Sequence, residues 1–163
     1  MLGRAKWIDL DLDGARASVE RSLSLAPNYS FGFYNSAILN AIHCDGKRAE
    51  THVASALARS PIDPHRQTML GTRALAAFVR EDGEAALAHV DEALATPNAH
   101  AHVYLIAAGV YATYGDAAKA SVVVNALHER QLSLETSGFR KHFDLQDEGQ
   151  KARLFGTLER LGA

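Results

Sequence analysis

The chain has 163 residues, of which 47% are hydrophobic and 22% charged, and its formal net charge is −2. This composition is ordinary for a globular domain, and a near-neutral charge without basic clusters argues against nucleic acid or an anionic membrane as a partner. The single cysteine, Cys44, excludes an internal disulfide, and no apolar run is long enough to cross a bilayer, so we expect a cytoplasmic protein.

Apolar residues recur at three- and four-residue spacing over most of the chain, which predicts a helical protein. Two kinds of break alternate between the helices: one has Gly beside an acid, and the other contains Pro. A first helix is expected before Asp11, with Trp7, Ile8 and Leu12 on its apolar side. The helices that follow are expected over residues 15–25, 30–43, 47–59, 65–80, 84–95, 99–114 and 117–130.

The periodicity stops after residue 130, and residues 131–146 are expected to form a connector with one short helical turn near 137–142. A last helix is expected over residues 147–161. Its apolar residues at helical spacing are Ala152, Phe155, Leu158 and Leu161. Because the end of a helical array otherwise exposes an apolar face, this helix should cap the preceding helix pair, with Phe139 and Phe143 beneath it. The alternative is that it docks on another chain.

Four positions recur along the helices with a fixed spacing of 12, 4 and 3 residues, and they usually hold a small residue, Ala, Val, and Ala or Ser. The sets are Gly3/Ala15/Val19/Ser22, Ala37/Ala49/Val53/Ala56, Ala74/Ala86/Val90/Ala93 and Ala108/Ala120/Val124/Leu127. A period of this length indicates an array of helix pairs. The small residues allow the two helices of each pair to approach closely, and the Val fills the space towards the next pair.

This spacing resembles the tetratricopeptide repeat (TPR), whose pattern also ends on a proline, here Pro27, Pro61 and Pro97. The resemblance covers residues 1–130 and implies an all-α fold: a right-handed α-solenoid of antiparallel helix pairs, about 3.5–4 TPR units, with a C-terminal capping helix. Since little chain precedes Gly3, we expect either that the first unit is truncated or that the chain is the C-terminal piece of a longer protein. We therefore divide the chain into the TPR array, residues 1–130, and the connector with its capping helix, residues 131–163.

Two loop phrases narrow the resemblance: residues 21–29 (RSLSLAPNY) and 56–64 (ALARSPIDP). Together with the tail from residue 139 onwards, they resemble the C-terminal TPR region of bacterial nucleotide cyclases and winged-helix regulators. This implies a regulatory segment of a bacterial signalling protein. The chain contains neither the metal-binding Asp pair of a cyclase nor a winged helix.

A partner groove is expected on the concave side, which the first helices of the pairs line in TPR folds. The residues expected to project there are Phe31, Tyr34, Ile38, Thr68, Gly71, Leu75, His102, Leu105 and Gly109. Such an apolar, aromatic-rimmed groove favours a helix or an apolar peptide, with Tyr34 as the best single contact. It lacks the Lys, Arg and Asn of a carboxylate clamp. The alternative is that these residues pack on one another and leave no groove.

The sequence contains few residues in arrangements that support catalysis or metal binding. The chain has eight histidines, but no His-x-x-x-His or Glu-x-x-His pair, and His100 and His102 should point apart on a regular helix. His52 and His89 occupy the same repeat position on the outer side of a helix. Cys44 follows His43 at a helix end without a third group to orient the imidazole, and no glycine-rich phosphate loop occurs. We predict no catalytic residue, no metal site and no cofactor.

The sequence therefore leaves two functional hypotheses. The first is a non-catalytic TPR protein–protein interaction module that holds a protein or peptide in the groove. The second is a homodimerisation domain that uses the open first repeat or the apolar groove, because an uncovered apolar face around Trp7 and Ile8 would favour self-association. An enzymatic role has only the histidine count in its favour.

Overall fold

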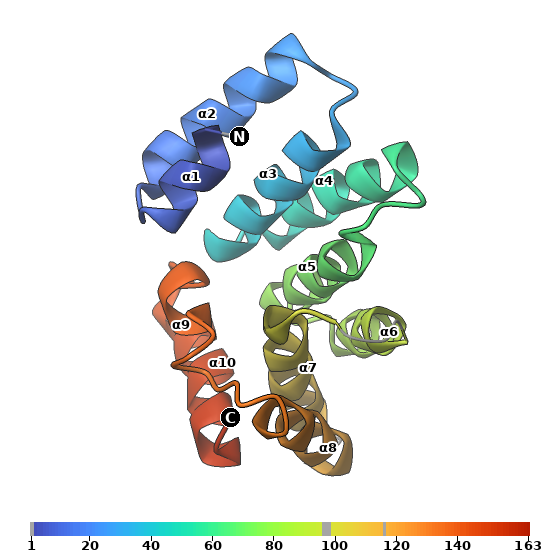
Figure 1. Cartoon of the computed structure of the whole chain (residues 1–163), viewed down its shortest axis with the longest axis vertical. Helices are drawn as coiled ribbons and strands as arrows, with labels where there is room; N and C mark the ends of the chain where they lie inside the picture. Colours follow the sequence, from blue (N-terminus) through green and yellow to red (C-terminus); the bar gives the residue numbers. More distant parts are fainter. Residues whose placement is uncertain (1, 96–98, 116) are drawn as a thin grey trace.

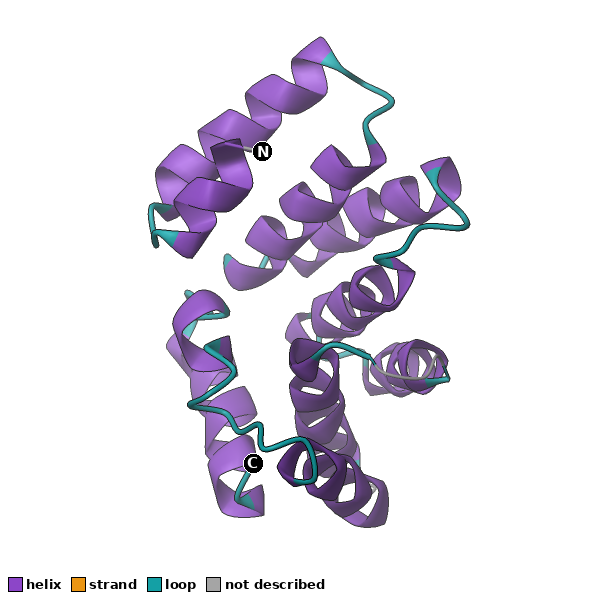
Figure 2. Ribbon diagram, in the orientation of Figure 1, coloured by secondary structure: helices purple, strands orange, loops and turns teal. Residues whose placement is uncertain are grey.

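The computed structural model describes residues 2–95, 99–115 and 117–163, and within these residues the chain is all-α, with ten helices and no strand (Figure 1, Figure 2). The helices are α1 (Leu2–Ile8), α2 (Leu12–Leu25), α3 (Ser30–Ile42), α4 (Gly46–Arg59), α5 (Arg66–Val79), α6 (Gly83–Leu94), α7 (Ala101–Tyr114), α8 (Ala117–His128), α9 (Phe139–His142) and α10 (Glu148–Leu161). No helix in the described part is both long and apolar enough to cross a membrane.

Consecutive helices pack as antiparallel pairs: α1 with α2, α3 with α4, α5 with α6, and α7 with α8. The second helix of each pair also contacts the first helix of the next pair. In addition, α5 contacts both α3 and α7, so the first helices of the second, third and fourth pairs form a continuous row (Figure 1). This is the arrangement that the sequence period predicts for a helical repeat.

The recurring residues lie where the helices cross. All sixteen members of the four sets are buried except Ser22, which is half-buried. A β-carbon on Gly3 would lie 2.5 Å from Cγ2 of Val19, so α1 and α2 meet at the predicted positions. The predicted register is confirmed in each pair.

The turn inside each of the first three pairs has the same construction. A residue in the left-handed backbone region precedes an Asp whose carboxylate accepts a hydrogen bond from an amide in the first turn of the next helix. The left-handed residues are Leu10, Cys44 and Glu81, with φ of 65°, 58° and 62°, and the caps are Asp11, Asp45 and Asp82. The fourth pair has Gly115 at φ 106°, and Asp116 follows outside the described residues. Each turn thus ends one helix and begins the next within a few residues.

Most expected helix limits agree with the structure, and the differences occur at the ends. The second helix begins at Leu12 instead of residue 15 because the Asp11 carboxylate caps it. The seventh begins at Ala101 instead of residue 99, since His100 has extended backbone. The break expected at Pro97 lies outside the described residues.

The C-terminal segment packs on the fourth helix pair, as predicted. α10 packs on α7 and α8, and Phe139 and Phe143 are buried, with the Phe139 ring 5.9 Å from that of Phe155 (Figure 1). A β-carbon on Gly109 of α7 would lie 2.4 Å from Leu154, so α10 sits close against α7.

The same segment also reaches the other end of the chain. The Trp7 indole Nε1 donates a hydrogen bond of 2.7 Å to the carbonyl oxygen of His142, and the Phe143 ring lies 5.5 Å from the Trp7 ring. The amide of Gln146 donates to the carbonyl oxygen of Ile42 at 2.8 Å. The connector and α9 therefore lie along the inner side of the array and join its first and last parts (Figure 2).

Candidate ligand-binding site

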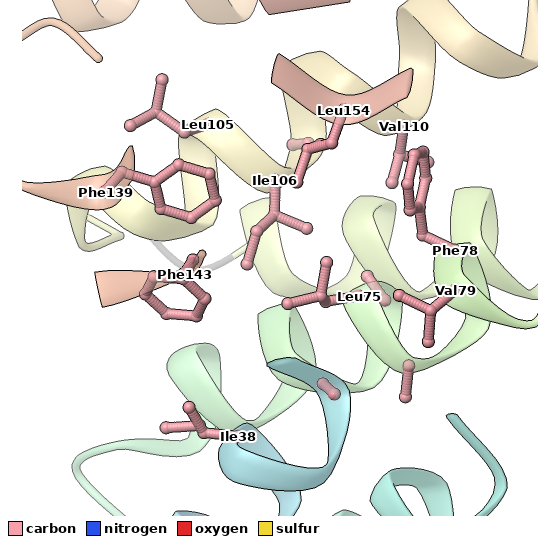
Figure 3. Close-up of a cluster of buried hydrophobic side chains, with 14 of the residues drawn as sticks. Ile38, Leu75, Phe78, Val79, Leu105, Ile106, Val110, Phe139, Phe143 and Leu154 are labelled. Carbon is pink, nitrogen blue, oxygen red and sulfur yellow. The ribbon is translucent and has the colours of Figure 1, made fainter. Parts of the chain in front are cut away.

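Three of the residues predicted to line the concave groove are part of the core. Ile38, Leu75 and Leu105 have at most 1% of their surface exposed. Figure 3 shows them in one cluster with the C-terminal aromatic residues Phe139 and Phe143. For these three positions the alternative reading applies: the side chains pack on one another and on the chain's own C-terminal segment.

Three other predicted groove residues line a cavity of about 280 Å³, which we call the inner pocket, whereas Gly71 and Gly109 are buried against Val103 and Leu154 and do not line it. Tyr34, Thr68 and His102 line it, while Phe31 lies beside Tyr34 with ring centroids 5.7 Å apart. The full lining is Arg4, Trp7, Tyr34, His65, Thr68, Thr72, His100, His102, Val103, Ile106 and Phe143. The predicted site is thus reduced to a small pocket with several polar groups.

Five parts of the chain build this pocket. α1 supplies Arg4 and Trp7, α3 supplies Tyr34, and Phe143 follows α9 in the C-terminal segment. α5 and α7 contribute residues from their N-terminal halves, and the residues that cap these helices, His65 and His100, line the pocket too. The pocket therefore lies where two helix N-termini, each with a partial positive charge, meet the first and last parts of the chain.

Arg4 is the one fully charged residue of the lining, and sequence reasoning missed it. Its guanidinium carbon lies 5.5 Å from the Trp7 ring centre and 5.6 Å from the Phe31 ring centre, so two aromatic faces hold it. Nη1 is 3.5 Å from the Asn35 amide oxygen. Among the described residues no acid forms an ion pair with Arg4, and none of the pocket residues is acidic. The signal that could have found it is its place three residues before Trp7 on the inner face of the first helix.

Tyr34 lines the pocket and has 5% of its surface exposed. Burial raises the pKa of its phenol, while hydrogen bonding with Thr68 and the nearby Arg4 charge act in the opposite direction. The phenol is therefore neutral near pH 7 and can donate or accept a hydrogen bond.

His100 and His102 are brought together, contrary to the sequence-based expectation that they point apart. Their ring centroids are 4.5 Å apart, because His100 precedes α7 and its Nδ1 accepts a hydrogen bond from the amide of His102. Burial lowers the pKa of His102 to about 4, and burial followed by the charge of Arg4 lowers the pKa of His100. Near pH 7 the His102 ring is neutral, and its Nε2 is 3.2 Å from the Ser137 carbonyl oxygen, to which it donates.

Other candidate groups do not form a site. Within residues 2–95, 99–115 and 117–163, no group of three His, Cys, Asp or Glu side chains could hold a metal ion. Burial raises the pKa of the Cys44 thiol, which opposes formation of a reactive thiolate. His52 and His89 are half-buried and not on an outer face; His52 Nδ1 lies 2.7 Å from the Ser36 hydroxyl of the partner helix in its pair.

Neither a protein-family model nor a curated protein matches this chain.

Proposed function

We propose that the chain is a right-handed α-solenoid of TPR type that acts as a non-catalytic protein–protein interaction module. The observation that carries this proposal is the burial of the same small-residue set at the crossing of all four helix pairs. Arrays of such pairs expose extended surfaces and serve as scaffolds for partners. The loop phrases at residues 21–29 and 56–64 support the finer proposal that the chain is the regulatory C-terminal part of a bacterial signalling protein.

The partner surface that we propose is an aromatic rim beside the inner pocket, formed by Tyr29, Phe31 and His65. The Phe31 ring lies 6.3 Å from that of Tyr29 and 5.5 Å from that of His65, and Tyr29 and His65 are exposed. Aromatic side chains with polar tips provide contact area at low entropic cost and are frequent in interface hot spots. The C-terminal segment packs in one core cluster with the predicted groove residues Ile38, Leu75 and Leu105, so we propose that a protein partner contacts Phe31 and its two exposed neighbours instead.

Site-specific photo-crosslinking tests this proposal. A photoreactive phenylalanine analogue replaces Phe31 in one variant and exposed Val122 of α8 in the control, and both are irradiated in cells that express the chain. We expect a discrete crosslinked protein from position 31 that is absent from position 122 and is lost when Tyr29 is changed to Ser. Identical products from both positions, or products unaffected by Tyr29→Ser, would contradict the proposed surface.

A second candidate function is homodimerisation, and one surface favours it. Leu2 and Leu25 are 66% and 76% exposed at the rim of a cavity of about 240 Å³ between α1, α2 and α3. Size-exclusion chromatography with light scattering over a dilution series tests it with the parent and a Leu2→Ser/Leu25→Ser variant. A dimer that the double substitution converts to a monomer would support this function, whereas a parent monomer at all concentrations would exclude it.

A further inference from the structure

The inner pocket carries an inference that goes beyond the proposed interaction function and does not depend on it. Its volume of about 280 Å³ is just below the range of about 300–1,000 Å³ that is usual for ligand sites. A pocket of this size takes a small molecule, whereas a helix or an extended peptide segment needs a longer groove.

The charge of the lining points to an anion. Arg4 has no acidic partner among the described residues, and α5 and α7 begin at the pocket with the positive ends of their dipoles. Tyr34 and His100 add groups that can donate hydrogen bonds, and no carboxylate competes for them within the lining. A charged guanidinium without a counter-ion beside a pocket is an arrangement that an anionic ligand would complete.

The number and shape of the donors favour a carboxylate over a phosphate. Arg4 supplies one full positive charge, and the neutral ring of His102 already donates from Nε2 to Ser137. A guanidinium presents two parallel N–H groups that match the two oxygens of a carboxylate. A single charge balances a monoanion better than it balances the higher charge of a phosphate monoester.

The remaining walls are apolar and aromatic. Trp7 and Phe143 meet edge-to-face with ring centroids 5.5 Å apart, and Val103 and Ile106 of α7 complete this side. A ligand with a short hydrophobic body would bury that body here while its charged group stays near Arg4.

We propose that the inner pocket binds a small monocarboxylic acid with a compact aromatic or branched body. Its carboxylate pairs with Arg4, the Tyr34 phenol donates a further hydrogen bond, and its body lies against Trp7 and Phe143. Because Trp7 belongs to α1 and Phe143 to the C-terminal segment, the ligand also strengthens the contact between the two ends of the chain.

The fluorescence of Trp7 can report binding, since Trp7 is the only tryptophan of the 163 residues and lines the pocket. Benzoate is the probe, benzamide is its neutral counterpart of the same shape, and inorganic phosphate at equal ionic strength tests for a general anion effect. We expect benzoate to change the Trp7 fluorescence saturably, with half-saturation at about 1 mM or below, and to raise the midpoint of thermal unfolding. Benzamide and phosphate should bind at least about tenfold more weakly.

Two variants assign the effect to the pocket. Arg4→Gln removes the charge and keeps much of the stem, whereas Arg16→Gln removes the same charge from an exposed site on α2 where Arg16 pairs with Glu20. Arg4→Gln should weaken benzoate at least about tenfold, and Arg16→Gln should leave its binding unchanged. Circular dichroism verifies that both variants are folded.

Three results would overturn the proposal: no saturable response to benzoate, an equal response to benzamide or phosphate, or equal affinities of the Arg4→Gln and Arg16→Gln variants. The first two comparisons use the unchanged chain, so they decide the question even if Arg4→Gln fails to fold. A positive result would stand whether or not the aromatic rim yields a crosslinked protein.

Discussion

Gly46, the first residue of α4, lies directly against α5, and Gly46→Ala should therefore destabilise the protein. A β-carbon at this position would be 2.6 Å from the carbonyl oxygen of Ala76, and side-chain atoms of Arg80 and Val79 lie at 2.6 and 2.8 Å. The nearest atom belongs to the backbone of a buried helix, so it cannot rotate away as a side chain could. The two helix pairs must separate to admit one methyl group.

The magnitude follows from two opposing contributions. Overpacking of a buried contact costs about 1–3 kcal/mol, and Ala gains up to about 1 kcal/mol over Gly in helix propensity, but less in the first turn than in a helix interior. We expect a net loss of about 1–2 kcal/mol in the free energy of unfolding. For a domain of this size that lowers the unfolding midpoint by about 2–8 °C.

The matched control is Gly156→Ala in the interior of α10. There the nearest atom to a β-carbon is Nη1 of Arg160 at 3.6 Å, so the methyl group fits and the propensity gain remains. Thermal and urea unfolding followed by circular dichroism should show opposite signs: a loss for Gly46→Ala and a gain of about 0.5–1 kcal/mol for Gly156→Ala. If Gly46→Ala were as stable as the parent, the close approach of α4 to α5 would be refuted.

Three further changes test other features. In urea unfolding, the Leu10→Gly variant should be more stable than the Leu10→Ala variant by about 1 kcal/mol, because only Gly lacks the β-carbon that makes a φ of 65° costly. Equal stabilities of the two variants would argue against the left-handed backbone at this turn. The pKa of about 4 for His102 lies below the ordinary histidine value of 6.5, so the unfolded chain binds more protons than the folded chain between these pH values. The free energy of unfolding should therefore fall by up to about 3 kcal/mol as the pH drops from 7 to 4. His102→Gln should flatten that dependence in acid titrations, whereas exposed His128→Gln should keep it; parallel curves for His102→Gln and the parent would contradict the assignment. Phe143→Ala removes a ring that is 4% exposed and should lower the free energy of unfolding by about 3–5 kcal/mol. It should also accelerate amide hydrogen exchange in α1, and unchanged exchange there would show that the C-terminal segment does not hold α1.

The helix pairs could be predicted from the sequence because their determinants are local. Ala37, Ala49 and Val53 lie within two neighbouring helices, so their spacing alone shows which faces meet. The cap by α10 was also predictable, since Phe155 and Leu158 repeat at helical spacing and an array end needs a cover.

The candidate site depended on contacts that sequence spacing does not contain. Ile38 and Leu75 could line an open groove or belong to the core. The outcome depends on the curvature of the whole array, because the curvature determines whether the C-terminal segment can reach them. The role of Arg4 does not follow from the repeat pattern, in which the first helix is a truncated unit, yet this helix supplies Arg4 and Trp7 to the pocket. His100 turns towards His102 because α7 begins two residues later than the periodicity suggested.

The bond from Trp7 to the carbonyl of His142 spans 135 residues and depends on the number of helix pairs that lie between the two residues. Open helical arrays tolerate gain or loss of a repeat, since each unit touches only its neighbours. Here one extra pair would carry α9 beyond the reach of α1, and one pair fewer would leave it short. Unlike an open array, this chain would therefore lose the bond between the indole and the carbonyl if a helix pair were inserted or deleted between α1 and α9.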